Sequence, residues 1–592
     1  MKKNTWQLKI YMKIISFVFT GIILASCAKN KTSANPVTAG DSLYNLSLST
    51  NKAVYNPGEN IVFTINKAPV GCTIRYRHLG EILKEEPLNT TSWNWQLPSA
   101  DFYGYLVEVY KKSRTDEKTI TSVGVDVSSD GIHFPRNGFV SAYGILSDDY
   151  MSTVMSSLNR YHMNVVQFQD WEFKHHLPLA GTVTGPLDNW NDIANRNNTM
   201  ATVKQYINLA HRYNMKTLSY NLIYGALIDA ATDGVSDEWY MYQDANHITK
   251  EVFALPKPPF KSDIYFLDPS NSGWQNYIAN KTQEAYQVYN FDGYQVDQVG
   301  NRNKNLYTYS GNILNLEVTF KSFLEAMKSD MPDKNLVMNA VNQYGQEISI
   351  SKSPVDFLYT EVWSPNESYK DLATIILNNN VWSSNAKKSV LCAYMDYTLA
   401  NNPGFFNTPG VLLTDAVIFS FGGSHLELGE HMLGKEYFPN GNLQMKDDLK
   451  STIINYYDFM TAYENLLRDG GLFNNLTLNC TNGKMSIGGW PPQSGKISVQ
   501  GKTINNIEIF HLINFASAAH FDWRDTNGNQ TAPVTLSGAD LEATINHPVT
   551  KIWVASPDIN FGVPQIIPFT QNGDIVHFTL PQLKYWDMVV LE

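Results

Sequence analysis

Two acidic residues that lie 64 positions apart have the surroundings that acid–base chemistry needs. Asp297 closes the apolar run FDGYQVDQVG, and Glu361 closes the run SPVDFLYTEVW. Alternation along a strand places each acid on one side, at the carboxyl end of its run. Cleavage of a glycosidic bond uses such a pair, one carboxyl group protonated to assist the leaving oxygen and the other ionised to meet the positive charge that develops on the sugar. A lone strand-end acid is more often a turn or helix-capping residue, so the hypothesis depends on the two occurring together.

Polar and aromatic side chains follow the ends of other predicted strands, a composition that suits a sugar site. Sugar hydroxyls bind planar polar groups, and the C–H face of the ring stacks on aromatic side chains. Each of these residues taken alone is more often structural than functional, and the hypothesis rests on their arrangement. The candidates for substrate binding are Asp170, Trp171, His175, His176, Asn221, Tyr224, Gln295, Asn339, Trp363, Tyr394, Asp396, His425 and Glu427.

Eight apolar runs, alternating with stretches of helical period, would position these side chains. Apolar residues between the runs recur at three- and four-residue steps, for example after the cap-like Ser270 and Asn271. This order predicts a (β/α)8 TIM barrel over residues 131–469, with chemistry at the carboxyl ends of its strands. A doubly wound sheet is the alternative, but no glycine-rich phosphate loop follows the first run. The predicted strands are 139–145, 164–170, 216–224, 291–297, 335–341, 355–361, 389–397 and 416–423.

Short alternating strands flank the predicted barrel on both sides, so the fold class is multidomain, α/β with all-β. Residues 46–130 have the turn spacing of an immunoglobulin-like β-sandwich, for which we expect a structural or accessory role. An amphipathic stretch closes the barrel near Asp469, and residues 470–592 predict a C-terminal β-sandwich. The length of 592 residues agrees with several domains, because it exceeds what one hydrophobic core normally serves.

Residues 1–27 have the features of a lipoprotein signal peptide. A basic start precedes an apolar stretch that is too short and too one-sidedly flanked for a membrane span. The ending LASC resembles a bacterial lipobox, which predicts cleavage before Cys27 and lipidation of its thiol. Residues 28–45 are polar and predict a flexible tether. We therefore expect an exported lipoprotein of a bacterial cell envelope, held by its lipid anchor alone at the outer membrane, on the periplasmic face or the cell surface.

Composition narrows the class of partner. The chain has 43% hydrophobic and 17% charged residues, as ordinary globular proteins do, and a formal net charge of -11. Nucleic-acid binding needs concentrated Lys and Arg, so we set it aside. Cys72, Cys392 and Cys480 are far apart without a CxxC or His cluster, which predicts buried thiols and no metal site. We expect no redox cofactor and leave a structural calcium ion open, although no EF-hand-like spacing of acids is present.

The motifs around the two acids resemble those of glycoside hydrolase family 66, the dextranases and cycloisomaltooligosaccharide glucanotransferases. The resemblance covers the predicted barrel and the order of its flanking β-domains. It implies a retaining enzyme that acts on α-1,6-linked glucan, with Asp297 as nucleophile and Glu361 as general acid/base. It also implies that Asp170, Asn221 and Tyr224 line the glucose site beside the scissile bond. The stretches that carry it are FDGYQVDQVG, DFLYTEVW, QFQDWEFKHHLPL, SYNLIYGA, FSFGGSHLELGEHML and EYFPN.

Hydrolysis and transfer remain to be distinguished within this resemblance. The transferases of the family carry an additional carbohydrate-binding module inside the barrel region, whereas only a short segment separates Asp396 from the predicted eighth strand. We therefore expect an endo-acting dextranase that cleaves dextran to isomaltooligosaccharides, with the cyclising transferase as the alternative. Two further alternatives are a non-catalytic glycan-binding lipoprotein and a barrel glycosidase with another linkage preference.

Overall fold

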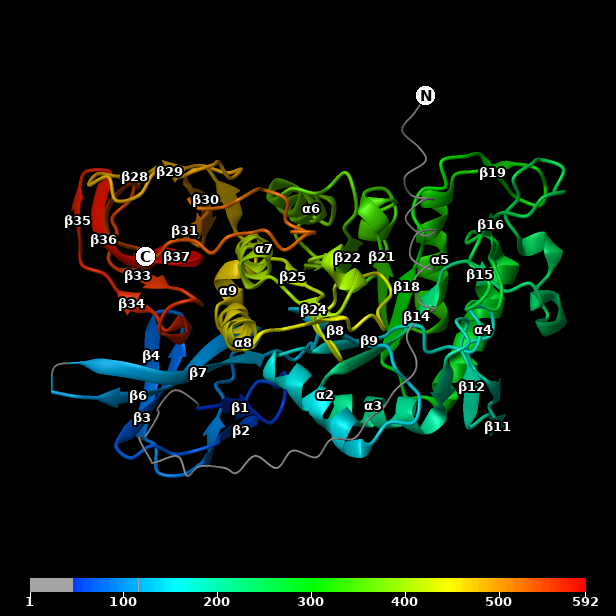
Figure 1. The fold of residues 1–592 in the computed structure, drawn as a ribbon, viewed down its shortest axis with the longest axis horizontal. Helices are drawn as coiled ribbons and strands as arrows, with labels where there is room; N and C mark the ends of the chain where they lie inside the picture. The colour runs from blue at the N-terminus through cyan, green and yellow to red at the C-terminus, as the bar shows by residue number, and fades with distance from the viewer. Residues whose placement is uncertain (1–45, 115) are drawn as a thin grey trace.

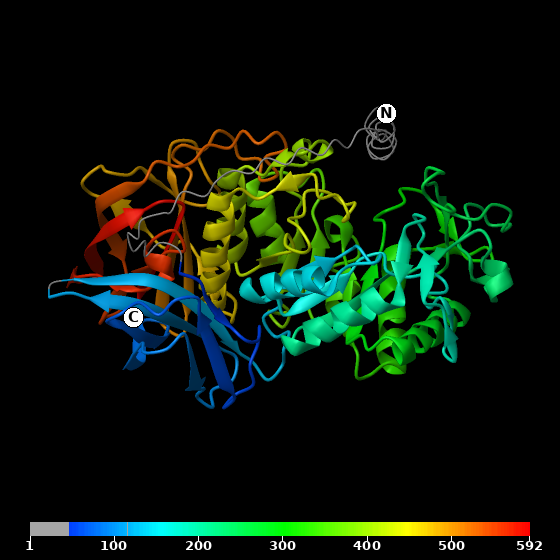
Figure 2. The ribbon, with the colours of Figure 1, turned by 60° about the horizontal axis from the view of Figure 1, so that its bottom comes forward.

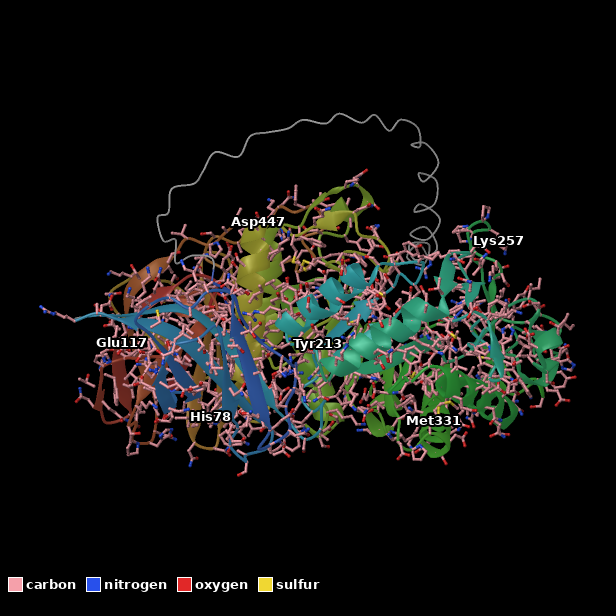
Figure 3. All side chains as sticks on the ribbon, turned by 90° about the horizontal axis from the view of Figure 1, so that it is seen from below. His78, Glu117, Tyr213, Lys257, Met331 and Asp447 are labelled. Carbon is pink, nitrogen blue, oxygen red and sulfur yellow. The ribbon has the colours of Figure 1, made fainter. Side chains whose placement is uncertain are left out.

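The computed structural model describes residues 46–114 and 116–592. The predicted signal peptide, Cys27 and most of the predicted tether lie outside the described residues. Figure 1 shows the two β-domains beside one another at one end of the molecule, the barrel in the middle, and a lobe inserted between β14 and α4 at the other end. Figure 3 labels Glu117 on the N-terminal β-domain and Lys257 on this lobe, at opposite ends. Among the described residues, no helix combines the length and the apolar character that crossing a membrane requires.

The central sheet consists of eight parallel strands and closes on itself. Phe139 of the first strand forms a parallel bridge with Gly429, and its backbone nitrogen donates to the carbonyl of Leu428 over 3.2 Å. Side chains from around the ring, such as Leu218 and Phe357, form one buried cluster. The predicted barrel is therefore confirmed. Its strands in order are β8 (Asn137–Val140), β9 (Val165–Phe168), β14 (Lys216–Leu222), β18 (Gly293–Asp297), β21 (Asn335–Asn339), β22 (Leu358–Glu361), β23 (Ser389–Cys392) and β25 (Ser424–His425).

Helices cover the outside of the barrel, and α2 and α3 lie side by side on one flank (Figures 1 and 2). The predicted start of α4 is confirmed, because the side chain of Asn271 caps it by accepting from the backbone nitrogens of Gly273 and Trp274. The amphipathic stretch before Asp469 forms α8 and α9 as predicted. The helices are α2 (Asp148–Arg160), α3 (Met200–Arg212), α4 (Ser272–Val288), α5 (Leu316–Asp330), α6 (Tyr369–Trp382), α7 (Thr408–Ser420), α8 (Asp447–Ala462) and α9 (Glu464–Leu467).

The prediction of the eighth strand at 416–423 is wrong. Most of that run belongs to helix α7, and the strand is the two-residue β25 that follows it. Twelve of the 13 residues of α7 are buried, because the helix packs against α6, α8, β25 and strand β31 of the C-terminal domain. A helix that is buried on all sides has no apolar stripe, so its sequence has the same appearance as a buried strand.

Both flanking β-domains are pairs of antiparallel sheets, as predicted. Each pair encloses its own buried apolar cluster. The N-terminal sheets are β1 (Leu48–Thr50), β2 (Asn60–Ile65), β5 (Ser92–Gln96), and β4 (Glu81–Pro87), β3 (Cys72–His78), β6 (Tyr103–Lys112), β7 (Glu117–Val127). The principal C-terminal strands are β27 (Leu472–Asn474), β30 (Ile497–Ile504), β31 (Ile507–Asn514), β37 (Trp586–Leu591), β33 (Ile552–Ala555), β34 (Gln565–Ile566), and β28 (Leu478–Cys480), β32 (Leu536–Thr544), β36 (Ile575–Leu583), β35 (Phe569–Asn572).

Candidate active site

Asp297 and Glu361 meet through a single amide. Nδ2 of Asn339 donates to Oδ1 of Asp297 over 2.8 Å and to Oε2 of Glu361 over 3.0 Å. The backbone nitrogen of Glu361 in turn donates to Oδ1 of Asn339 over 3.2 Å, which fixes the amide between the two acids. Because one nitrogen reaches both, the two acceptor oxygens are at most about 6 Å apart, close to the spacing of retaining glycosidases and below that of inverting ones.

The order of the barrel strands explains this meeting. Asp297 is the last residue of β18 and Glu361 the last residue of β22, and both keep partial exposure. Strand β21 lies between them, pairs with both in parallel, and ends at Asn339. The prediction that the two acids end strands two places apart is therefore confirmed, and the residue that ends the intervening strand has the length to bond both.

A tyrosine hydroxyl binds the outer oxygen of each acid. Tyr220 on β14 donates to Oδ2 of Asp297 over 2.8 Å, and Tyr394 donates to Oε1 of Glu361 over 2.6 Å. The sequence analysis did not select Tyr220. Alternation could have found it, because Tyr220 is paired in register with Gln295 and therefore shares the side that carries Asp297.

Burial gives the two acids different protonation behaviour. Burial raises the pKa of Glu361 to about 7, and the charge of Asp297 raises it further, against the hydrogen bonds from Tyr394 and Asn339. Burial also raises the pKa of Asp297, but hydrogen bonds from Asn339, Tyr220 and the backbone oppose this effect. The arrangement suits an ionised Asp297 beside a Glu361 that holds its proton near neutral pH.

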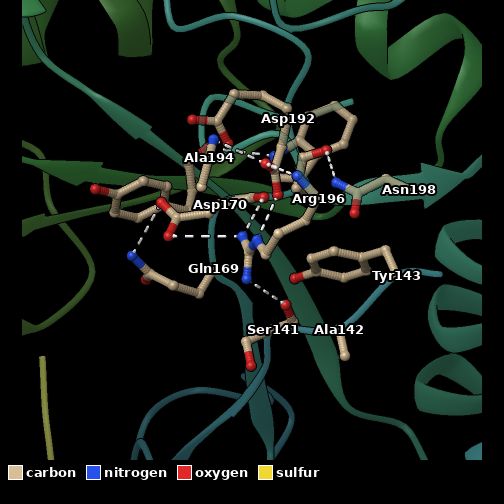
Figure 4. Close-up of polar contacts among 12 residues, drawn as sticks. Ser141, Ala142, Tyr143, Gln169, Asp170, Asp192, Ala194, Arg196 and Asn198 are labelled. Atoms are coloured by element: carbon tan, nitrogen blue, oxygen red, sulfur yellow. Dashed lines mark hydrogen bonds and ion pairs between the residues drawn. The ribbon is translucent and has the colours of Figure 1, made fainter. Parts of the chain in front are cut away.

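Asp170 brings a third acid to the same end of the barrel (Figure 4). It follows β9, and Oδ2 lies 3.9 Å from Nη2 of Arg196. Burial raises the pKa of Asp170 to about 7, while the guanidinium of Arg196 opposes the shift. Tyr220 connects the acids, because burial and then the charges of Asp297 and Asp170 raise the pKa of its hydroxyl well above the usual range.

The C-terminal domain contributes a side chain beneath the site. Arg524 donates to the carbonyl oxygens of Tyr394 over 3.2 Å and of Val362 over 2.9 Å. Its guanidinium carbon lies 5.2 Å from the ring centroid of Trp363, whose ring is 5.3 Å from that of Tyr394. The partly exposed Trp363 is therefore held among Arg524 and neighbouring aromatic rings, which is how a stacking platform for a sugar would be fixed. Arg524 has no local sequence signal, since it reaches the barrel from a distant domain.

Five of the candidate ligand contacts lie behind the site and brace it. Trp171, His175, His176, Asn221 and Tyr224 expose at most 3% of their surface. Nδ2 of Asn221 donates to the carbonyl of His175 over 2.8 Å, and the hydroxyl of Tyr224 accepts from the backbone nitrogen of Val299 over 2.8 Å. Their predicted role in lining the glucose site is wrong, because these side chains are used in holding the loops after the strands.

Four further candidates also face away from the two acids. Gln295 is buried in the barrel interior, 1% exposed. Asp396 is 0% exposed, and its Oδ2 accepts from the backbone nitrogen of Asn407 over 2.8 Å. His425 and Glu427 are 0% exposed and lie between the barrel and its outer helices. Nδ1 of His425 is 2.8 Å from Asp415 of α7, and Oε1 of Glu427 accepts from Tyr457 of α8 over 2.9 Å. The prediction that these four bind substrate is therefore wrong.

Two groups of acidic and histidine side chains among the described residues have the spacing of metal ligands. They are His176 with Asp229 and Asp233, and Asp415 with His425 and Glu427. In the first, the ammonium of Lys174 already lies 2.7 Å and 2.8 Å from the two aspartates. Neither group includes Asp297, Glu361 or Asn339.

Comparison with known proteins identifies the family. The profile named glycosyl hydrolase family 66 matches residues 50–590. The chain belongs to this family. A cycloisomaltooligosaccharide glucanotransferase of Niallia circulans is 26% identical to this family 66 protein over 745 aligned positions, which cover 98% of this chain and 76% of the relative. A dextranase of Streptococcus salivarius is 23% identical over 570 positions, covering 83% and 67%.

A solved structure shares the whole fold of this family 66 protein. It is a cycloisomaltooligosaccharide glucanotransferase of Paenibacillus sp. in complex with cycloisomaltoheptaose. The TM-score is 0.84 at 24% sequence identity, and the match covers 92% of this chain and 99% of the other. The barrel and both flanking β-domains are therefore common to the two proteins.

Proposed function

We propose that this protein is a retaining, endo-acting glycoside hydrolase that cleaves α-1,6-glucosidic linkages of dextran to isomaltooligosaccharides. Asp297 is the nucleophile and Glu361 the general acid/base. The observation that carries the proposal is the amide of Asn339, which donates to both acids and keeps them at the separation that a covalent mechanism needs.

The first step forms a glycosyl ester. An oxygen of the Asp297 carboxylate attacks the anomeric carbon, and the bond from that carbon to O6 of the next glucose breaks. The proton of Glu361 goes to the leaving O6, for which the raised pKa of this acid keeps it ready. Asn339 and Tyr220 orient the attacking carboxylate and hold its charge.

The second step returns the enzyme to its starting state. Glu361, now ionised, takes a proton from a water molecule whose oxygen attacks the anomeric carbon. The ester bond to Asp297 breaks, and the carboxylate leaves with the electron pair. The products are a shortened glucan and a new reducing end of retained configuration. No oxidation or reduction occurs in the cycle.

The relatives support the choice of substrate. Those compared above are a cycloisomaltooligosaccharide glucanotransferase and a dextranase, so their names specify isomaltooligosaccharide and dextran. The same names support the cyclising transferase as the second candidate, and the transferase has the higher identity.

Two observations favour hydrolysis over cyclisation. The alignment with the transferase extends over 745 positions, more than the 592 residues of this chain, so the transferase has segments that this chain lacks. In this protein β23 ends at Cys392 and α7 begins at Thr408, which leaves no room there for an additional binding module. A wall that would fold a long glucan back onto the active site is therefore not supplied by this connection.

The test is reducing-end release from dextran by the protein without its leader. The variants are Asp297→Asn and Glu361→Gln, with Glu367→Gln as a matched control, since Glu367 is exposed on the loop after Glu361. We expect the two site variants to lose nearly all turnover and the control to retain it. Mass spectrometry of the products separates linear from cyclic oligosaccharides, which differ by one water. A parent that binds dextran without cutting it would favour the glycan-binding alternative.

A further inference from the structure

One guanidinium lies between two carboxylates that differ in how their oxygens are used (Figure 4). Arg196 precedes strand β13 (Asn197–Thr199), which forms a hairpin with β12 (Asn189–Asn191) in the loop after β9. Its Nε donates to Oδ2 of Asp192 over 2.6 Å, and its Nη2 is 3.9 Å from Oδ2 of Asp170. The two carboxylates share one cation but serve different purposes.

Asp192 is fully used in building the hairpin. Its side chain is 0% exposed, and Oδ1 accepts from the backbone nitrogens of Ala194 and Arg196, each over 2.9 Å. The other end of the guanidinium donates to the carbonyl oxygens of Ser141 over 3.1 Å and Asp170 over 3.3 Å. Arg196 is therefore fixed to the ends of the first two barrel strands, with little freedom to turn away.

Asp170, by contrast, has acceptor capacity to spare. Its carboxylate accepts one long hydrogen bond, 3.5 Å from Nε2 of Gln169, and 21% of the side chain is exposed. A carboxylate can accept about four hydrogen bonds. The backbone of Asp170 has a φ of 49°, a left-handed conformation that costs free energy in a residue with a side chain. Neighbouring contacts maintain it, because the carbonyl of Trp171 accepts from Trp190 over 3.1 Å.

The charges that face Asp170 come from several elements. Burial raises its pKa, Arg196 lowers it, Glu172 and Asp192 raise it, and His175 lowers it. Arg196 is the strongest of the favourable neighbours, so its removal would leave the carboxyl group protonated over more of the neutral range. A protonated carboxyl group accepts fewer hydrogen bonds from a sugar.

We propose that Arg196 is a positioning residue of the glucan site, which keeps Asp170 ionised and turned so that its oxygens accept hydrogen bonds from adjacent hydroxyls of one glucose unit. The ligand class is a neutral hexose with free neighbouring hydroxyl groups. The inference rests on the proposed function, because it assigns the group that holds the sugar beside Asp297 and Glu361.

The test measures binding without turnover, by calorimetry with isomaltotriose in the Glu361→Gln background from about pH 5.5 to pH 8.5. We expect Arg196→Met to weaken binding about tenfold near pH 6 and much less near pH 8.5, where Asp170 ionises without help. Arg196→Lys should lie between. The matched control is Lys261→Met, because the Lys261 ammonium donates to the carbonyl of Asn191 on the same hairpin but has no contact with Asp170.

A second variant keeps the inference testable if Arg196→Met folds poorly. In Asp170→Asn, which cannot titrate, binding should be weak and independent of pH, and Arg196→Lys should then have no further effect. Equal weakening by Arg196→Met and Lys261→Met, or a loss of affinity that is the same at every pH, would overturn the inference in favour of a merely structural arginine. If the Glu361→Gln parent binds no isomaltotriose, the proposed substrate itself is wrong, and this inference fails with it.

Discussion

The hydroxyl of Tyr394 donates to Oε1 of Glu361 over 2.6 Å. A hydrogen bond to the ionised form lowers the pKa of an acid, so this contact restrains the rise that burial causes in Glu361. It lets the same side chain release its proton in the first step and act as a base in the second.

Tyr394→Phe should therefore move the pH profile of activity. Glu361 must be protonated for the first step, so activity falls as pH rises through its pKa. Loss of the hydroxyl raises that pKa, and the alkaline limb of kcat/KM should move up by about half a unit to one unit. At the same time kcat should fall, because the second step needs the ionised form. An unchanged alkaline limb would contradict the assignment of Glu361 as the acid.

Asn339→Ala should remove the amide that joins the two acids. We expect kcat to fall by about 100-fold or more, because a positioned donor to the reacting carboxylate is lost and the like charges are no longer separated. Steady-state kinetics on dextran measures this effect. Thermal unfolding in parallel should show little change, since both oxygens involved keep other contacts or partial exposure.

The raised pKa of Glu361 also predicts how stability depends on pH. A carboxyl group whose folded pKa is about 7, above about 4.3 in the unfolded chain, binds its proton more tightly when folded. Its contribution to folding is therefore present at low pH and is lost as pH rises through that window. Glu361→Gln should unfold at a higher temperature than the parent at pH 8 and at about the same temperature at pH 4. Glu367→Gln should follow the parent at both values.

A buried ion-pair group connects the N-terminal β-domain to the barrel. Arg136 is 0% exposed and lies 2.6 Å from Asp126 of β7 and 3.1 Å from Glu464 of α9. Arg136→Met should lower the free energy of unfolding by about 3–5 kcal/mol, because two buried carboxylates lose their partner. Urea denaturation measures the loss. Lys112→Met is the control, since its pair with Glu117 is exposed and its loss should have little effect.

The N-terminal segment carries a separate prediction. If Cys27 is the lipidated residue, the protein expressed in bacteria should incorporate labelled palmitate and sediment with membranes. Cys27→Ser should abolish both results. Labelling that persists in Cys27→Ser would contradict the lipobox interpretation.

Alternation along strands could locate the two acids, because both stand at the carboxyl ends of runs long enough to show a period of two. It could not separate the inner from the outer face of the barrel. Both faces of these strands are buried, so Asn221, His425 and Glu427 have the same sequence context as Asn339, which does reach the acids. The result was that several buried, bracing residues were taken for ligand contacts.

Residues that arrive from long loops or other domains left no local signal. Arg196 reaches Asp170 from a hairpin in the loop after β9, and Arg524 reaches Tyr394 from the C-terminal domain. Only the folded chain brings them to the site. Helix α7 was missed for a related reason, since the C-terminal domain buries the face that would otherwise have been polar.

The central claim is that Asp297 becomes covalently attached to the sugar. The most direct measurement treats Glu361→Gln with α-isomaltosyl fluoride, whose leaving group needs no acid, and maps the adduct by peptide mass spectrometry. Without its base the variant should accumulate the glycosyl ester, so the account predicts one isomaltosyl unit on the peptide that contains Asp297, absent in the double variant with Asp297→Asn. An adduct on another residue, or release of fluoride with inversion and no adduct, would contradict it.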